Sequence, residues 1–299
     1  MSDTPDIPLL GPSTLGARVQ RVPPQLYFVT SAVFHYLGPA FAVLLFVRVE
    51  PLGVAWLRIA SAALVFALWR RPWRFFRRLA PGERWTVIGL GCVLAVMNST
   101  FYLALDRLPL GTVGAIEFLG PIGLALAGMR TARNWGALAL AVAGVYLLTD
   151  VRIEGEPLGY LFAFANCALF MLYVVLGHRI ASAGGTSGID RLALAMLIAM
   201  VAALPIGLAQ ASPALASPIL LVAGIGVGIC SSVIPYVCDQ LAMARLPRAT
   251  FALMLALLPA MATIIGILVL RQVPTPVELA GIGLVIAGVA VHRAEARKE

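Results

Sequence analysis

The sequence is poor in charged residues: Asp, Glu, Lys and Arg make up only 12% of its 299 residues. A soluble domain normally carries about 25% charged residues. Hydrophobic residues make up 61% of the chain, which is more than a water-facing surface could tolerate, so lipid is the solvent that fits this composition. The net charge of +8 does not indicate nucleic acid as a partner, because the basic residues lie in short segments between apolar runs, where orientation in a bilayer accounts for them.

Motifs for metal binding, hydrolysis and nucleotide binding are also missing. The four cysteines show no C-x-x-C spacing and lie inside apolar runs, so neither a disulfide framework nor a metal site is predicted. There is no H-E-x-x-H, no G-x-S-x-G and no P-loop. We therefore predict a protein that is not an enzyme and holds no cofactor, and we expect any transport to be driven by a gradient. The polar, Pro-rich segment at the N-terminus is unlike a secretory signal.

Long apolar runs predict an all-α integral membrane protein with ten transmembrane helices. A bilayer core of about 30 Å needs about 20 apolar residues at 1.5 Å each. The charge-free run 192–238 is too long for one span, and we expect the stretch from Pro205 to Pro218 to divide it into a seventh and an eighth helix. The other eight predicted spans are 25–46, 53–69, 85–105, 112–128, 134–149, 158–176, 250–270 and 279–292, the last beginning nearer Pro274.

The basic residues are distributed unevenly between the two sides that these spans define. Of the 22 Lys and Arg residues, 17 fall on the side of the N-terminus, four fall on the opposite side, and Arg58 lies within a span. Because Lys and Arg are enriched in cytoplasmic loops, both termini are predicted to be cytoplasmic. The largest basic cluster, "RRPWRFF" at 70–76, is interpreted as a topology anchor, with binding of anionic membrane lipid as the alternative.

An internal repeat is visible in the chain. "ALDRLPLGTVGAIEFLGPI" begins at Ala104 and "AMARLPRATFALMLALLPA" at Ala242, and "GALALAVAG" at 136–144 is echoed by "AGIGLVIAG" at 280–288. The predicted units are an N-terminal tail 1–24, a first repeat 25–149, a second repeat 157–292 and a C-terminal tail 293–299. Each repeat holds five helices, so the second enters the membrane inverted, an arrangement common among secondary transporters.

Glu117 is the most informative candidate, because an ionised carboxylate deep in a span costs roughly 2.5–3.5 kcal/mol on insertion scales. Pro121 has no N–H to offer the carbonyl of Glu117, which leaves that carbonyl free for another partner. These features predict a helix face that lines a polar cavity, with Glu117 as a possible proton carrier. The alternative is a neutral, hydrogen-bonded glutamic acid that packs two helices. Pro259 repeats Pro121 in the second half, whereas Leu255 stands in the place of Glu117.

Other polar residues at membrane depth complete the candidate site. Arg58 could snorkel to the outer surface, or pair with a substrate carboxylate or with Glu117. Asn98 and Tyr236 occupy matching positions in the two repeats, which favours a cavity lined by the third and eighth helices. Asp239 lies at the inner end of the eighth helix, where an interfacial role near Arg245 is the alternative. His35, Tyr36 and Tyr102 are further polar or aromatic groups that, taken singly, are usually packing residues.

Four segments of the chain together resemble the EamA family of the drug/metabolite transporter superfamily, in particular its bacterial inner-membrane threonine and homoserine exporters. These segments are "GVAWLRIASAALVFALWRRPWR", "MNSTFYLALDRLPLGTVGAIEFLGPIGLAL", "LYVVLGHR" and "IPYVCDQLAMARLPRATFALM". The resemblance implies ten helices, cytoplasmic termini, a central cavity and efflux of amino acids. It also implies that Arg58, Asn98, Tyr102, Glu117, Tyr236 and Asp239 are typical of the family. The chain departs from the family at Leu258 and Gln272, where relatives carry acidic residues.

The resulting hypothesis is a secondary transporter of the bacterial inner membrane that exports small amino acids, threonine or homoserine first. Glu117 would hold the ammonium group of the substrate and Arg58 its carboxylate, with proton coupling as one option. An exporter of aromatic amino acids, nucleosides or drugs with the same fold is the first alternative. A membrane scaffold or receptor without transport is the second. The expected partners are a small metabolite and membrane lipid, and the oligomeric state is not predicted.

Overall fold

The computed structural model describes residues 22–76, 79–120, 131–150, 156–181, 187–243 and 257–291, and within these ranges every regular element is a helix. The all-α class is therefore confirmed for the described part of the chain. The elements are α2 (Pro24–Leu45), α3 (Pro51–Arg70), α4 (Trp73–Phe76), α5 (Pro81–Leu105), α6 (Leu110–Glu117), α8 (Ala132–Asp150), α9 (Pro157–Ala181), α10 (Ser187–Gln210), α11 (Ser212–Leu215), α12 (Pro218–Gly228), the π-helical turn η1 (Ile229–Val233), α13 (Ile234–Met243), α15 (Leu257–Leu270) and α16 (Pro276–Val291).

Proline marks the start of many of these helices. The first residue of α2, α3, α5, α9, α12 and α16 is a proline. Proline suits this position because its fixed φ is helical and its missing N–H would have no partner within the helix. The high proline content of an otherwise helical chain is thus concentrated where it defines helix starts.

Among the residues that the structure describes, six helices are long and apolar enough to cross a membrane: Gln25–Leu45, Pro51–Arg70, Pro81–Leu105, Pro157–Gly177, Asp190–Gln210 and Pro218–Cys238. Three shorter apolar helices cover Ala132–Leu148, Leu258–Leu270 and Pro276–Gly288. The remaining predicted span, 112–128, contains most of α6 and continues into 121–130, outside the described residues. The count of ten spans therefore stays a prediction.

The predicted division of the run 192–238 within Pro205–Pro218 is confirmed, although α10 continues through Pro205 and ends only at Gln210. The chain is interrupted only at 211–217, where the short helix α11 forms. Packing against α3 accounts for this: Gly207 lies so close to Trp56 that a Cβ there would collide with the indole, and Trp56 Nε1 donates to the carbonyl of Met200 at 3.1 Å. Tertiary contacts thus hold the helix across a proline that removes only one internal hydrogen bond.

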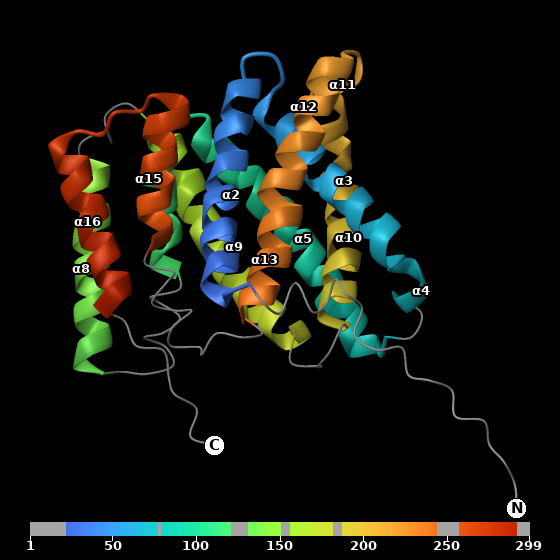
Figure 1. Cartoon of the computed structure of the whole chain (residues 1–299), viewed down its shortest axis with the longest axis horizontal. Helices are drawn as coiled ribbons and strands as arrows, with labels where there is room; N and C mark the ends of the chain where they lie inside the picture. Colours follow the sequence, from blue (N-terminus) through green and yellow to red (C-terminus); the bar gives the residue numbers. More distant parts are fainter. Residues whose placement is uncertain are drawn as a thin grey trace, which may run out of the picture.

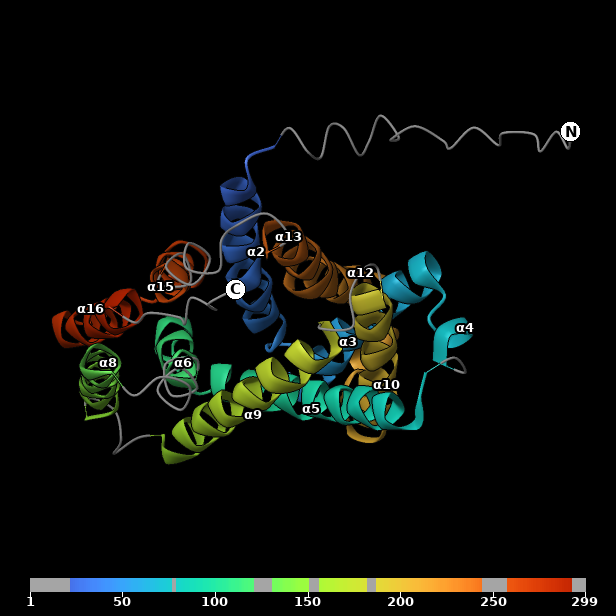
Figure 2. The same ribbon diagram turned by 90° about the horizontal axis from the view of Figure 1, so that it is seen from below.

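The helices form two groups on either side of α2 (Figure 2). Helices α6, α8, α15 and α16 gather on one side, and α3, α10 and α12 lie on the other, with α5 and α9 running side by side beneath them. The start of α2 and the end of α16 lie at the same end of the bundle (Figure 1). The most extensive pairings are α8 with α16, α3 with α10 and α5 with α9.

The helix pairings are nearly unchanged when the two predicted repeats are exchanged. Taken in order, α2, α3, α5, α6 and α8 correspond to α9, α10, α12–α13, α15 and α16. Helix α2 packs against α13 and α15, and its counterpart α9 packs against α5 and α6. Helix α3 packs against α12, and its counterpart α10 packs against α5. Three further pairs, α3 with α10, α6 with α15 and α8 with α16, each join a helix to its own counterpart.

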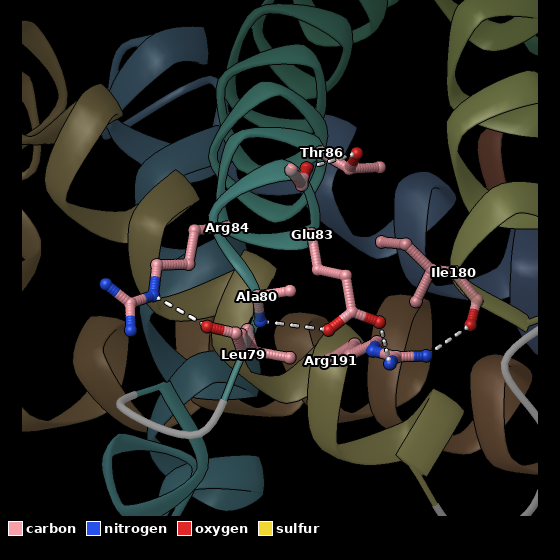
Figure 3. A network of polar contacts seen from close by, with 8 residues as sticks. Leu79, Ala80, Glu83, Arg84, Thr86, Ile180 and Arg191 are labelled. Carbon is pink, nitrogen blue, oxygen red and sulfur yellow. Dashed lines mark hydrogen bonds and ion pairs between the residues drawn. The ribbon is translucent and has the colours of Figure 1, made fainter.

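Ion pairs join the helices at one end of the bundle, where α3 ends and α5 and α10 begin. Arg191 Nη2 lies 2.5 Å from Glu83 Oε1, and Arg191 Nη1 donates to the carbonyl of Ile180 at 2.9 Å (Figure 3). Glu83 also accepts from the backbone N–H of Ala80 at 3.2 Å. A second pair joins Arg70 to Asp190 at 2.7 Å. Two adjacent residues of α10 in the second predicted repeat therefore contact two helices of the first.

Candidate functional site

Arg58 of α3 lies inside the bundle rather than at its surface. Its side chain is buried, its Nε donates to Ser232 Oγ at 3.0 Å, and its Nη2 donates to the carbonyl of Ser231 at 3.1 Å. The guanidinium carbon lies 5.6 Å from the centroid of the Tyr102 ring on α5, within the range of a cation–π contact. The expectation that Arg58 could snorkel to the surface is therefore wrong, and its charge is held in the interior.

The π-helical turn η1 places the two serines that hold Arg58. Ser231 donates its hydroxyl to the carbonyl of Val227 at 2.6 Å. Glycines let neighbouring helices approach this turn closely. A Cβ on Gly38 of α2 would collide with Ser231, and a Cβ on Gly228 would collide with Ser61 of α3. Isolated π-turns within helices are frequent at functional sites, and here the turn brings α2, α3 and α12–α13 together around one guanidinium.

Glu117 is the last residue of α6, and its carboxyl group is buried. Its Oε1 accepts a hydrogen bond of 3.2 Å from Asn166 Nδ2 on α9. Glu117 Oε2 and Asn166 Oδ1 are buried and have no hydrogen-bond partner among the described residues. Helix α6 ends here, since Phe118 follows as a turn, although the predicted span 112–128 runs through this position without a break. Pro121 lies outside the described residues, and its predicted effect on the carbonyl of Glu117 stays a prediction.

Tyr36 of α2 completes the arrangement. It is fully buried, and its hydroxyl finds no hydrogen-bond partner within the described ranges. A Cβ on Gly114 of α6 would lie 3.3 Å from that hydroxyl, which places Tyr36 about one helical turn from Glu117. Glu117 interacts electrostatically with Tyr36 and with Arg58. We call Tyr36, Arg58, Tyr102, Glu117 and Asn166 the central cluster; its members come from α2, α3, α5, α6 and α9.

The other predicted site residues lie elsewhere or are only partly described. Asn98 is buried and donates Nδ2 to the carbonyl of Leu94 in its own helix at 2.7 Å. Tyr236 belongs to a hydrophobic cluster that includes Met97, the neighbour of Asn98. Asp239 is within α13, but its side chain lies outside the described part of the structure. Pro259 is buried near the start of α15, and its carbonyl accepts from Thr263 at 2.9 Å.

A cavity of about 340 Å³ lies near the central cluster, and none of the five residues of the cluster lines it. Its lining includes Asp106 and Arg107 between α5 and α6, Thr112 of α6, Gln272 and Glu278. Thr112 precedes Glu117 by five residues, which is about 7.5 Å along a helix. The cavity therefore lies on the side of the cluster toward the turn between α5 and α6.

The sequence prediction did not single out Asn166, Ser231 or Ser232. Each is a small polar residue within an apolar run, with no charge to make its burial exceptional. Their importance comes from contacts with Glu117 and Arg58 across 49, 173 and 174 positions of the chain. The only sequence signal was the presence of an amide or hydroxyl at membrane depth.

A bundle of apolar helices that encloses a carboxylate and a guanidinium is typical of membrane transport proteins. Residues 157–293 match the EamA-like transporter family. Threonine/homoserine exporter RhtA of Escherichia coli (strain K12) is 32% identical over 265 residues, covering 88% of each chain. The protein of the same description in Salmonella typhimurium (strain LT2) is 32% identical over 253 residues, covering 84% of each. The chain belongs to the EamA-like transporter family, as its sequence segments predicted.

A solved crystal structure supports the fold. It superposes on this chain with a TM-score of 0.59 and 22% sequence identity, over 90% of this chain and 95% of the other. At this identity the likeness concerns the fold alone.

Proposed function

We propose that the protein is a secondary transporter that exports small neutral amino acids, threonine or homoserine first, across the bacterial inner membrane. The observation that carries the proposal is the burial of Glu117 and Arg58 in one cluster between the two halves of the bundle. The description of the relatives as threonine/homoserine exporters supports the choice of substrate.

The central cluster has the chemistry that a zwitterion requires. An amino acid leaving water needs a counter-charge and hydrogen-bond partners at each end. Glu117 Oε2 and Asn166 Oδ1 are buried acceptors suited to an ammonium group, whose N–H groups are donors only. Arg58 and the hydroxyl of Tyr36 are donors suited to the carboxylate. Asn98, Tyr102, Tyr236 and Asp239 are proposed to border the translocation path.

Inverted repeats provide the route for alternating access in this proposal. The exchange of pairings between α2 and α9, and between α3 and α10, supports a two-fold relation of the halves. Equivalent hydrogen bonds at the starts of α8 and α16 agree with this two-fold relation. The N–H of Asn134 donates to Thr131 Oγ1 and the N–H of Glu278 donates to Thr275 Oγ1, both at 3.2 Å, and the two pairs are 144 positions apart in the sequence. We accordingly propose ten spans, five in each of the repeats 25–149 and 157–292, with cytoplasmic tails.

Tolerance to toxic amino acids tests the function. Cells that overproduce the protein should survive high external threonine or homoserine better than controls and accumulate less of either. Glu117→Gln and Arg58→Gln should remove this protection at normal protein levels, whereas Arg48→Gln, an exposed arginine between α2 and α3, should keep it. Protection only against aromatic amino acids, nucleosides or cationic drugs would overturn the substrate assignment, and no flux of any metabolite would favour a scaffold or receptor.

A further inference from the structure

Glu117 and Asn166 are arranged as half of a carboxyl–amide pair. A protonated carboxyl and a primary amide can form two parallel hydrogen bonds, N–H to carbonyl oxygen and O–H to amide oxygen. The structure contains the first of these, from Asn166 Nδ2 to Glu117 Oε1 at 3.2 Å. The two atoms that the second bond would join are Glu117 Oε2 and Asn166 Oδ1, and both are buried without a partner in the part of the chain that the structure describes.

The missing component must be a donor. Both unpaired atoms accept hydrogen bonds, and an ionised carboxylate and an amide oxygen cannot satisfy each other. One proton on Glu117 Oε2 would satisfy both atoms at once. An ammonium group placed between them would do the same with two of its three N–H groups. The two occupants need the same two oxygens, so they exclude one another.

We propose that the Glu117–Asn166 pair couples transport to protons by holding either one proton or the ammonium group of the substrate. This inference rests on the proposed function. On the cytoplasmic side the Oε2–H bond of Glu117 breaks, its proton passes to water, and the substrate binds as a zwitterion that keeps its own three N–H bonds. On the external side the substrate leaves and Oε2 takes a proton from water. Asn166 is a positioning residue that presents the second oxygen.

The charged groups around Glu117 determine how much net charge crosses the membrane in each transport cycle. Arg58 on α3, Tyr36 on α2 and Cys167 on α9 interact electrostatically with Glu117. Helix α15, which packs against α6, has no titratable residue, and Glu278 of α16 lines the cavity near the turn between α5 and α6. Tyr102 of α5 lies against Arg58, and α8 carries its charges, Arg133 and Asp150, near its ends.

With these charges, the exchange of a substrate zwitterion for a proton is electrogenic. With Arg58 cationic throughout, the site is neutral when Glu117 is ionised, and it stays neutral when it holds a zwitterion. It carries one positive charge when Glu117 is protonated. Each outward zwitterion is therefore exchanged for one inward proton, which carries the single positive charge that moves. A membrane potential that is negative inside thus drives export even without a pH difference.

Threonine binding to the purified protein, measured between about pH 5.5 and 8.5, tests the competition. In the wild type, the affinity for threonine should fall as pH falls, approaching about tenfold per pH unit where Glu117 is largely protonated. Glu117→Gln provides an N–H where the protonated acid has its O–H, so it mimics the protonated pair. This variant should fold with thermal stability at least equal to that of the wild type and bind no threonine at any pH.

Asn166→Ala should weaken threonine binding and move the midpoint of the pH profile. Ser99→Ala, which removes a hydroxyl bonded only within α5 at 2.8 Å, should change neither. Pyranine-loaded liposomes should show proton uptake when threonine leaves them, and the uptake should increase with a negative-inside potential.

Two results would overturn the coupling role while leaving threonine export intact: threonine affinity that is independent of pH, or an Asn166→Ala variant that alters thermal stability but not the pH profile. Absence of threonine binding and flux in the wild type would instead reject the proposed function, and this inference with it.

Discussion

Two buried tyrosines differ in what their hydroxyl groups contact. Tyr160 of α9 donates to the carbonyl of Leu148 at 2.9 Å and so ties α9 to α8. Tyr36 is at least as deeply buried, yet its hydroxyl has no partner among the described residues. A buried polar group without a partner costs roughly 1–3 kcal/mol of stability. This unpaired donor agrees with the proposed role of the Tyr36 hydroxyl in binding the substrate carboxylate.

Replacing each tyrosine by phenylalanine should separate stability from binding. Tyr36→Phe should keep or raise the thermal melting temperature, because it removes an unsatisfied hydroxyl. It should also weaken threonine binding by about two- to tenfold, the worth of one net hydrogen bond. Tyr160→Phe should lower the melting temperature and leave threonine affinity unchanged. Melting of the purified proteins and equilibrium binding measure both effects.

The opposite pattern would make Tyr36 a structural residue. A clear loss of stability in Tyr36→Phe with normal threonine affinity would mean that its hydroxyl is satisfied by a group of the protein or by water, and that it contributes nothing to the substrate site.

At the residue scale, the charged members of the candidate site were the ones that the sequence could predict. Glu117 and Arg58 could be predicted because ionised groups are rare and costly at membrane depth, and the structure brings both into the central cluster. The role of Asn166 could not be predicted, because a lone amide is tolerated in many helices and only the approach of α9 to α6 gives it a partner. Asn98 shows the converse: its amide bonds within its own helix.

At the scale of elements, glycines set the distance between α8 and α16. A Cβ on Gly281 would lie 2.7 Å from the carbonyl oxygen of Gly144, and one on Gly288 would lie 2.7 Å from that of Ala137. Gly283 of the same helix has open space where its Cβ would be. Along α16, Gly281 and Gly288 thus leave no room for a side chain, whereas the position of Gly283 between them does.

Alanine at these glycines should have opposite effects. Gly281→Ala should destabilise the protein by about 1–3 kcal/mol, because overpacking must push the two helices apart. Gly283→Ala should be neutral or stabilising by up to about 1 kcal/mol, since alanine favours a helix more than glycine does. Melting temperatures of the two variants in one detergent give the comparison. Equal effects of both substitutions would contradict close packing of α8 on α16.

The helices themselves were predicted well from apolar length, whereas the exact positions of their interruptions were not. The break predicted within Pro205–Pro218 is present, but α10 continues past Pro205 to Gln210, and no residue signalled the π-helical turn at Ile229–Val233. Both outcomes depend on tertiary packing: α3 supports α10 around Pro205, and Arg58 bonds to two residues of η1. A proline or glycine in sequence thus indicates where a helix can be altered, and its neighbours decide the result.

At the scale of the whole molecule, the ion pair between Glu83 and Arg191 in Figure 3 joins the two predicted repeats at one end. The side chain of Arg191 is only 8% exposed, while that of Glu83 is 42% exposed, so the pair is partly desolvated and should contribute more than an exposed one. Glu83→Arg places two guanidinium groups together and should lower thermal stability markedly.

Adding Arg191→Glu to Glu83→Arg restores opposite charges and should recover part of the lost stability. Recovery should be partial, because the exchanged side chains cannot reproduce the bonds to Ala80 N and the Ile180 carbonyl. The coupling in a double-mutant cycle should be about 0.5–3 kcal/mol. Additive effects of the two substitutions would show that the contact contributes nothing to stability.

The orientation of the whole bundle in the membrane follows from where its basic residues lie. The start of α2 and the end of α16 share one end of the bundle (Figure 1), as an even number of spans requires. Of the 22 Lys and Arg residues, 17 fall on that predicted side, which should be cytoplasmic because positive residues resist translocation.

Reporter fusions after Arg78 and Arg191 should therefore be active on the cytoplasmic side, and fusions after Thr149 and Ser217 on the external side. Ser217 is the most discriminating position, because it follows α11, the short helix between α10 and α12. An internal signal there would mean that α10 and α12 do not cross the membrane as separate spans, and the predicted charge distribution would lose its basis.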